Sequence, residues 1–470
     1  MTTPPVRWWS ALIGAAVALL SGSRAAIAAE RPSHVLVVSI DGLAWDRLNK
    51  HLARLPTLAG LIATGAAGPL QTVFPSMTWA AHASLATGMN PGGHGVLGNR
   101  FYDRSTDDVV ESWQRDAGLL RAPALWQVAK AAGWSTAALL WPQTNRAQGL
   151  DFQVPEVYGQ HNFEAGATPG ALAALQSQAG LPAGHMGKFG SEELFLCDSW
   201  QRDAAVWLVQ ARQPKLLMLH FLSVDTLSHG WGPGAVEPRW GLELVDRYLA
   251  DVLAAYAKLG LRDKLAVMVV SDHGFLELTQ AFSPAEALAQ APMTASERQL
   301  IRVAVNGQAL FVYAKGPRPP PVVLPAKKGA KPPKLTPVQS ALAKFKAHLA
   351  KQAEVEGITE MDQFVEQGLG DPQLDPNLPE FIAVLRPDVQ SIQGNKPAPK
   401  GRISGGGHGY LPTLPALFGV WIAQGPGLAK GKALVGSKVI DVAPTLAKLL
   451  GWKWPQAQDG APKADALLEK

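Results

Sequence analysis

The chain has 470 residues, of which 47% are hydrophobic and 17% are charged, so it can bury a large core and is not a disordered tail. Its formal net charge is +5, but two basic residues lie in the first 24 positions and six in the segment 315–334, so the remainder is not basic. We therefore expect no nucleic-acid-binding face. The single cysteine, Cys197, excludes an intrachain disulfide.

The N-terminus has the features of a secretory signal peptide. Arg7 precedes an apolar run over 8–20, and small residues suited to a signal peptidase follow at 25–29. A retained membrane anchor is the alternative, but the apolar run is shorter than the roughly 20 residues that span a bilayer. We expect a signal peptide over 1–29, a periplasmic or secreted location, and no transmembrane anchor in the mature protein.

The first predicted strand ends at a carboxylate. The continuous apolar run over 34–40 is typical of a buried parallel strand, and it stops at Asp41. Ligands of open α/β sheets gather at the carboxyl ends of the strands, so Asp41 is well placed to hold a metal ion. A plain Asp-Gly turn or a helix cap is the alternative interpretation.

The segment 72–99 carries a candidate nucleophile. A strand-like run over 69–74 and a pattern of small residues typical of a helix over 80–87 place Thr78 at a strand-to-helix turn. The first amide N–H groups of a helix are unpaired and attract anions, so Thr78 could face an anionic ligand. Its alternative role is to cap the helix. Asn99 follows in a glycine-rich turn, where it could donate its amide N–H or support the turn.

The middle of the chain alternates between helical and strand-like patterns. A helix is predicted over 124–133 and a strand over 134–141, and the Gly-, Pro- and Gln-rich segment 151–188 is expected to be irregular. Two further helices are predicted over 191–213 and 237–259. This alternation indicates a parallel sheet with helices on its faces.

Two more apolar runs lead into groups that can bind metals. The run over 214–222 precedes Asp225 and His229, which are four residues apart and can reach a single cation. The run over 265–271 leads directly into Asp272 and His273. Several strands that end at such groups are hard to ascribe to turn chemistry alone.

The C-terminal third contains a looser region and one further candidate ligand. We expect the segment 281–400 to be a cap inserted between the two parts of a core, 30–280 and 401–470. It contains the Pro-rich basic stretch 315–334, expected to be an exposed loop, and a predicted helix over 336–356. His408 lies in a glycine cluster with little core to pack against, so we interpret it as a ligand. A strand over 416–423 and a helix over 441–450 follow.

Together these groups suit a site with two zinc ions. Mixed nitrogen and oxygen donors favour zinc, whereas oxygen donors alone would favour magnesium or calcium. Seven ligands exceed the needs of one tetrahedral ion. Two ions can clamp the attacking and leaving oxygens of a phosphoryl displacement, with Thr78 attacking phosphorus as an alkoxide. Asn99 and the backbone N–H after Thr78 could donate to a phosphoryl oxygen.

The ordered motifs resemble the alkaline phosphatase superfamily, and within it the type I phosphodiesterase/nucleotide pyrophosphatase branch. They are Asp41-Gly, Phe74-Pro-Ser-Met-Thr78 with His82, His94-Gly-Val-Leu-Gly-Asn99, Asp225 with His229, Ser271-Asp-His-Gly274 and Gly407-His-Gly409. The resemblance implies an α/β fold, a three-layer sandwich with a mostly parallel central sheet and an inserted cap. It also implies a covalent phosphothreonine intermediate and two Zn²⁺ per chain. One ion would be held by Asp41, Thr78, Asp272 and His273, and the other by Asp225, His229 and His408.

The departures from this family concern the substrate. Nucleotide-cleaving members commonly carry Phe-Pro-Asn after the nucleophile, whereas Trp79-Ala-Ala81 follows Thr78 here. A phosphodiesterase or nucleotide pyrophosphatase acting on a small-molecule phosphate ester is the first expectation. The alternatives are a phosphomonoesterase, which would need cations such as Arg100 or Arg146 at the site, a phosphonoacetate-hydrolase-like enzyme, a phospho-group transferase, and a non-catalytic binding module. The oligomeric state is left open.

Overall fold

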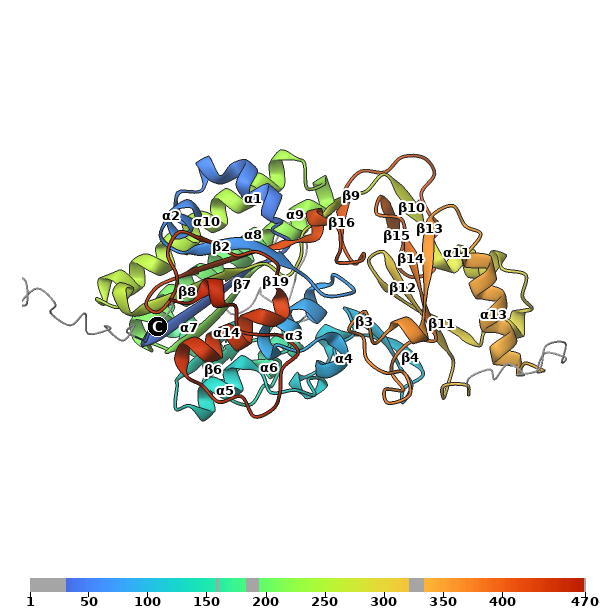
Figure 1. Ribbon diagram of the computed structural model, residues 1–470, viewed down its shortest axis with the longest axis horizontal. Coiled ribbons are helices and arrows are strands. Elements are labelled where there is room, and N and C mark those ends of the chain that lie inside the picture. Colours follow the sequence, from blue (N-terminus) through green and yellow to red (C-terminus); the bar gives the residue numbers. More distant parts are fainter. Residues whose placement is uncertain (1–30, 158–159, 183–193, 321–333, 469–470) are drawn as a thin grey trace, which may run out of the picture.

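The structure is a computed structural model that describes residues 31–157, 160–182, 194–320 and 334–468. The predicted signal peptide and residues 321–333 of the Pro-rich basic stretch lie outside the described residues. The described chain contains two main sheets, which occupy opposite ends of the molecule (Figure 1).

The larger sheet has the strand order β18-β2-β17-β8-β1-β7-β5-β6, with β19 also paired to β2. All pairings are parallel except those of β17, which runs antiparallel to β8 and β2. The strands are β1 (His34–Ile40), β2 (Ala66–Gln71), β5 (Thr136–Leu139), β6 (Phe152–Val154), β7 (Leu216–Phe221), β8 (Leu265–Val270), β17 (Gly419–Gln424), β18 (Lys432–Ala433) and β19 (Ser437–Lys438).

Helices cover both faces of this sheet. Successive side chains of a strand point to opposite faces, so Leu36 and Val38 of β1 pack in one core cluster, and Val35 and Val37 in the other. The first cluster includes residues of α2 (Pro56–Thr64), α8 (Leu194–Ala211) and α10 (Val236–Lys258). The second includes residues of α3 (Thr78–Thr87), α5 (Leu125–Ala131) and α14 (Val442–Leu450). Figure 1 places α10 and α14 on opposite sides of the strands, which confirms the predicted sandwich.

The second sheet lies in the segment predicted to be a cap. It is antiparallel, with the order β11 (Ile301–Asn306), β12 (Ala309–Ala314), β14 (Phe381–Leu385) and β13 (Val355–Glu360). We call it, with α11 (Pro284–Gln290) and α13 (Pro337–Leu349), the small lobe. Phe345 of α13 packs against the sheet. The sequence pattern did not reveal these strands, and α13 ends seven residues before the predicted limit of 356.

The segment 151–188 was wrongly predicted to be irregular. It contains β6, α6 (Gln160–Gly166) and α7 (Ala171–Ala179). The glycines that suggested breaks flank a helix instead, because Gly180 adopts the left-handed conformation (φ 69°) that ends α7. In the described part of the chain, no helix combines the length and the apolar character needed to cross a membrane.

Candidate active site

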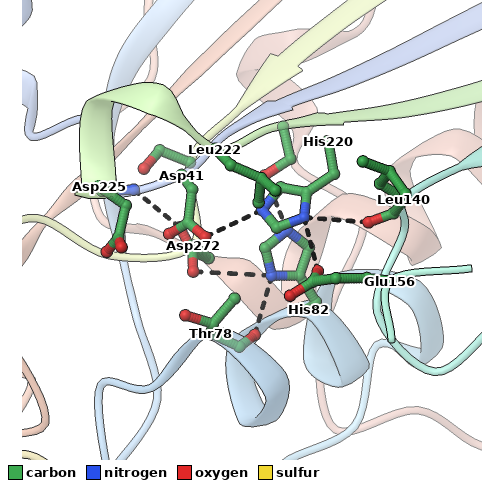
Figure 2. A network of polar contacts seen from close by, with 12 residues as sticks. Asp41, Thr78, His82, Leu140, Glu156, His220, Leu222, Asp225 and Asp272 are labelled. Atoms are coloured by element: carbon green, nitrogen blue, oxygen red, sulfur yellow. Dashed lines mark hydrogen bonds and ion pairs between the residues drawn. The ribbon is translucent and has the colours of Figure 1, made fainter. Parts of the chain in front are cut away.

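Three aspartates meet at one edge of the large sheet because they follow three adjacent strands. Asp41 follows β1, Asp272 follows β8, and Asp225 lies in the first turn of α9 (Ser223–Trp231), directly after β7. Strand β1 pairs in parallel with β7 on one side and β8 on the other, so the three carboxyl ends share an edge. The three carboxylates lie side by side in Figure 2.

Thr78 is the first residue of α3, and its side chain faces this cluster. It is 7% exposed, and its Oγ1 lies 3.3 Å from Nε2 of His273. Met77 occupies the position before the helix. The hydroxyl of Thr78 therefore bonds to a candidate ligand rather than capping its own helix, and it lies at the helix end where anions are favoured.

Three histidines direct one ring nitrogen each into the site. The Nδ1 atoms of His229, His273 and His408 lie near backbone carbonyls of Gly406 (3.0 Å), Gly274 (3.1 Å) and Ser76 (2.8 Å). A carbonyl can only accept, so each Nδ1 carries the proton and each Nε2 presents a lone pair. Burial lowers the pKa of His408 to about 3 and also lowers the pKa values of His229 and His273, which keeps the rings neutral.

The carboxylates experience the opposite shift. Burial, together with the charge of Asp225, raises the pKa of Asp41 to about 7. Burial and a neighbouring aspartate likewise raise the pKa values of Asp225 and Asp272 well above the ordinary range. Within the described residues, one oxygen of each carboxylate is buried without a hydrogen-bond partner: Oδ1 of Asp41, Oδ1 of Asp225 and Oδ2 of Asp272. Such groups are costly unless they are paired or bind a cation.

The arrangement of donors fits metal ions. Nε2 of His229 and Nε2 of His408 are 3.1 Å apart, although both carry lone pairs, and a shared cation would explain this approach. Donor atoms gather within 4.8 Å of one another in two groups: Asp225, His229 and His408, and Asp41, Asp225 and His273. Nε2 of His273 also lies 3.1 Å from Oδ2 of Asp272. The structure thus brings together all seven residues that the sequence suggested as ligands.

Asn99 also lies at the site. There it bonds to the backbone N–H of Trp79, the group that was expected to donate to a phosphoryl oxygen together with Asn99. Its Oδ1 accepts a hydrogen bond of 3.0 Å from the backbone N–H of Trp79. This bond occupies the N–H after Thr78 and turns the amide NH₂ of Asn99 toward the pocket, which it lines. Asn99 is therefore the better placed of the two expected donors.

The pocket in front of Thr78 has a volume of about 380 Å³ and is lined both by the small lobe and by the part of the chain that contains the large sheet, which we call the large lobe. The large lobe contributes the site residues, and the small lobe adds Gln308. The turn before Gln308 contacts the site. The side chain of Asn306 accepts a hydrogen bond of 2.9 Å from the N–H of Arg100 and donates one of 2.9 Å to its carbonyl. A Cβ on Gly307 would lie 1.6 Å from the carbonyl oxygen of His408, so this contact requires glycine.

The two arginines considered for the site occupy different positions. Arg100 lines the pocket, but its guanidinium is paired with Glu111 at 2.5 Å and lies 5.2 Å from the ring centre of Trp113. Arg146 lines a separate hollow with Asn145. Among the described residues that line the pocket in front of Thr78, Arg100 is the sole lysine or arginine.

Two buried groups behind the carboxylates were not predicted from the sequence. His220 lies within β7, where an imidazole interrupts an apolar run, and this interruption was an available signal. Glu156 follows β6, in the segment that was predicted to be irregular, and offered no comparable signal. Both have polar contacts in Figure 2, and His82 packs beside His220 with ring centres 4.3 Å apart.

The raised pKa values predict that the metal-free protein loses stability as pH rises above about 6.5 and through about 7, the pKa of Asp41. A carboxyl with a raised pKa holds its proton more tightly when folded, so ionisation at higher pH favours unfolding. Burial alone would lower the pKa of His220, but the hydrogen bonds to Asp41 and Glu156 outweigh it and raise the pKa. Loss of the His220 proton at higher pH therefore also lowers stability. The pKa values of His229, His273 and His408 are lowered, so these groups change stability only below about pH 6.5, where they are protonated in the unfolded chain. The melting temperature measured in a chelator should fall across this window.

The fold is that of the alkaline-phosphatase-like α/β proteins. The chain matches the family model "Type I phosphodiesterase / nucleotide pyrophosphatase" over residues 35–411 and belongs to this family. It is 23% identical to venom phosphodiesterase 2 of Crotalus adamanteus over 267 residues, which cover 55% of this chain and 29% of that protein. It is 24% identical to bis(5'-adenosyl)-triphosphatase ENPP4 of Pongo abelii, with 56% of this chain and 52% of that protein covered. The chain therefore spans about half or less of these relatives.

Solved structures with the same fold include human ectonucleotide pyrophosphatase/phosphodiesterase 5. That structure has a TM-score of 0.66 and 16% identity, and the match covers 93% of this chain and 100% of that one. The murine counterpart, an inactive threonine-to-alanine variant in complex with AMP, has a TM-score of 0.66, 18% identity and the same coverage.

Proposed function

We propose that this protein is an exported phosphodiesterase that uses two zinc ions and forms a covalent intermediate on Thr78. Nucleotide pyrophosphate bonds are included among its substrates. The observation that carries this proposal is the hydroxyl of Thr78, at a helix N-terminus and 3.3 Å from Nε2 of His273, beside three carboxylates with unpartnered buried oxygens. The family membership and the AMP-bound relative inactivated at a threonine support the same chemistry.

Each group then has a role. Bound zinc would lower the pKa of the Thr78 hydroxyl and offset negative charge on the phosphoryl and leaving oxygens. Oγ1 of Thr78 releases its proton to solvent and forms a bond to phosphorus. The bond from phosphorus to the leaving oxygen breaks, and that oxygen keeps the electron pair and takes up a proton from solvent. A water molecule then attacks phosphorus and restores the hydroxyl. One zinc would be held by Asp41, Thr78, Asp272 and His273, and the other by Asp225, His229 and His408.

The charge of the pocket favours a diester over a monoester. A monoester carries an additional charged oxygen and needs a free cation to bind it. The pocket-lining cation, Arg100, is already paired with Glu111. Neutral amide groups such as that of Gln308 would suit the uncharged second substituent of a diester.

A paired assay tests the proposed function. Purified, zinc-loaded mature protein is given a nitrophenyl phosphodiester and a nitrophenyl phosphomonoester under the same conditions. A strong preference for the diester supports the proposal. A preference for the monoester would make the protein a phosphatase, and no turnover of either would favour phosphonates, group transfer or a binding role.

Asn99→Ala should lower kcat on the diester by about 100-fold with a smaller change in KM, because one donor to the developing phosphoryl charge is lost. The hydrogen bond from the Trp79 N–H holds the Asn99 side chain in place before substrate binds, so little conformational entropy of this side chain is lost on binding. Steady-state kinetics of this variant and of the wild type measure the effect. A variant with an unchanged kcat would assign Asn99 to turn formation alone.

We further propose that the segment 281–400 caps a core formed by 30–280 and 401–470, and that the exported protein begins near Glu30. The contacts of Asn306 and Gly307 with the site support a cap that limits access. N-terminal sequencing of protein recovered outside the cytoplasm checks the export. A retained leader would instead favour a membrane-anchored transferase.

A further inference from the structure

A buried chain of hydrogen bonds leads from Glu156 through His220 to Asp41. Nδ1 of His220 lies 2.9 Å from Oε2 of Glu156, and Nε2 lies 3.0 Å from Oδ2 of Asp41 (Figure 2). His220 is fully buried, Glu156 is 7% exposed and Asp41 is 3% exposed. The three residues come from separate parts of the large lobe, so only the folded protein aligns them.

His220 differs from the three histidines that face the site. Their Nδ1 atoms bond to carbonyls and leave Nε2 as a lone pair, whereas both nitrogens of His220 face carboxylates. Nδ1 also lies 3.1 Å from the carbonyl oxygen of Leu140. Each ring nitrogen therefore lies beside a protein acceptor, so neither presents a lone pair to the site, and His220 is placed to donate its Nε2–H to Asp41 rather than to act as a ligand.

This hydrogen bond makes the two oxygens of the Asp41 carboxylate different. Oδ2 is held by His220, while Oδ1 is buried without a hydrogen-bond partner among the described residues and lies 3.5 Å from Nε2 of His273. A carboxylate without such a partner can rotate and offer either oxygen or both. The hydrogen bond from His220 to Oδ2 opposes this rotation and leaves Oδ1 as the oxygen without a hydrogen-bond partner.

The backbone of His220 is also fixed. Gln201 of α8 donates its Nε2–H to the carbonyl of His220 at 2.6 Å and accepts from the N–H of His220 at 3.3 Å. The neighbouring Asp198 accepts from the N–H groups of Leu222 and Ser223 at 2.9 and 3.0 Å. Helix α8 therefore holds the end of β7, from which both His220 and the turn bearing Asp225 project.

We propose that His220, oriented by Glu156, is a positioning residue that presents Asp41 to the metal through Oδ1. The inference rests on the proposed metal-dependent function. Hydrogen-bond partners that orient metal ligands commonly account for 10- to 100-fold in metal affinity, and this pair has the geometry for such a role.

The test measures zinc affinity by competition with a chelator and, separately, melting temperature in EDTA. His220→Leu should weaken one of the two zinc sites by about 10- to 100-fold. His220→Gln can keep an N–H donor near the position of Nε2 and should recover much of the affinity. His94→Gln is the matched control, because His94 is also fully buried but bonds to Ser84 and to the N–H of Val96. It should lower stability and leave zinc affinity unchanged.

A double variant separates positioning from folding. His220→Leu leaves the carboxylate of Glu156 buried without its partner, which is destabilising. Adding Glu156→Gln should restore part of the lost melting temperature while zinc affinity stays weak. If affinity recovers together with melting temperature, or if His220→Leu binds both zinc ions as tightly as the wild type, the positioning role is overturned. A wild-type protein that binds no zinc would overturn the proposed function as well, so the two failures are distinguishable.

Discussion

Thr78→Ala should reduce diester turnover by at least about 1,000-fold, because it removes the atom that attacks phosphorus. Zinc content should stay close to that of the wild type, since six of the seven proposed ligands remain. The side chain is small and lies at the start of α3, so its removal should change the melting temperature little. Turnover and metal analysis on the same preparation measure both effects.

Two variants control for this experiment. Thr78→Ser keeps a hydroxyl at the same position and should retain measurable turnover. Thr87→Ala alters another buried threonine of α3, whose hydroxyl donates to the carbonyl of Ala83 at 2.7 Å within the helix, and it should leave turnover nearly unchanged. Turnover by Thr78→Ala at the wild-type rate would refute a nucleophilic role. Trapping labelled phosphate on the wild type, but not on Thr78→Ala, would identify the covalent intermediate.

Asp225→Ala should lower zinc content to one ion per chain or fewer, and should reduce turnover by more than about 100-fold. Asp225 belongs to both groups of donor atoms, so one substitution weakens both. Its two oxygens lie 3.6 Å from Nε2 of His229 and 3.6 Å from Nε2 of His408. Without this carboxylate, the two imidazoles keep their lone pairs but lose the negative charge that offsets a divalent cation.

Asp246→Asn is the matched control for this loss of a carboxylate. Asp246 is also buried, but its oxygens accept hydrogen bonds from the N–H groups of Thr57 and Leu58, at the start of α2. Substitution there should lower the melting temperature while two zinc ions remain bound. Two zinc ions per chain in Asp225→Ala, measured by elemental analysis after dialysis, would contradict the assignment of Asp225 as a ligand.

The large sheet and most of the candidate site could be predicted from the sequence because both follow local patterns. Apolar runs that stop at Asp41 and Asp272 mark buried strands with a polar group at the carboxyl end. Parallel strands align their carboxyl ends, so such residues converge once the strands are adjacent. His408 was predicted from a different local pattern: an imidazole flanked by glycines has few neighbouring side chains to pack against.

The small lobe could not be predicted. Its strands pair residues from distant segments, as β12 does with β14, and the intervening Pro-rich and charged stretches conceal the alternation. Its contact with the site depends on Gly307, whose role is visible only beside the carbonyl of His408.

The sequence by itself determined which groups can bind metal and where each strand delivers them, because these properties depend on residue type and on order along the chain. Only the tertiary structure decided how those groups are oriented. His220 and Glu156 are 64 residues apart, and His220 and Asp41 are 179 apart, so no local pattern connects them. Their alignment requires that β1 and β7 be neighbours and that β6 close the edge of the sheet, and strand order is set by the packing of the whole core.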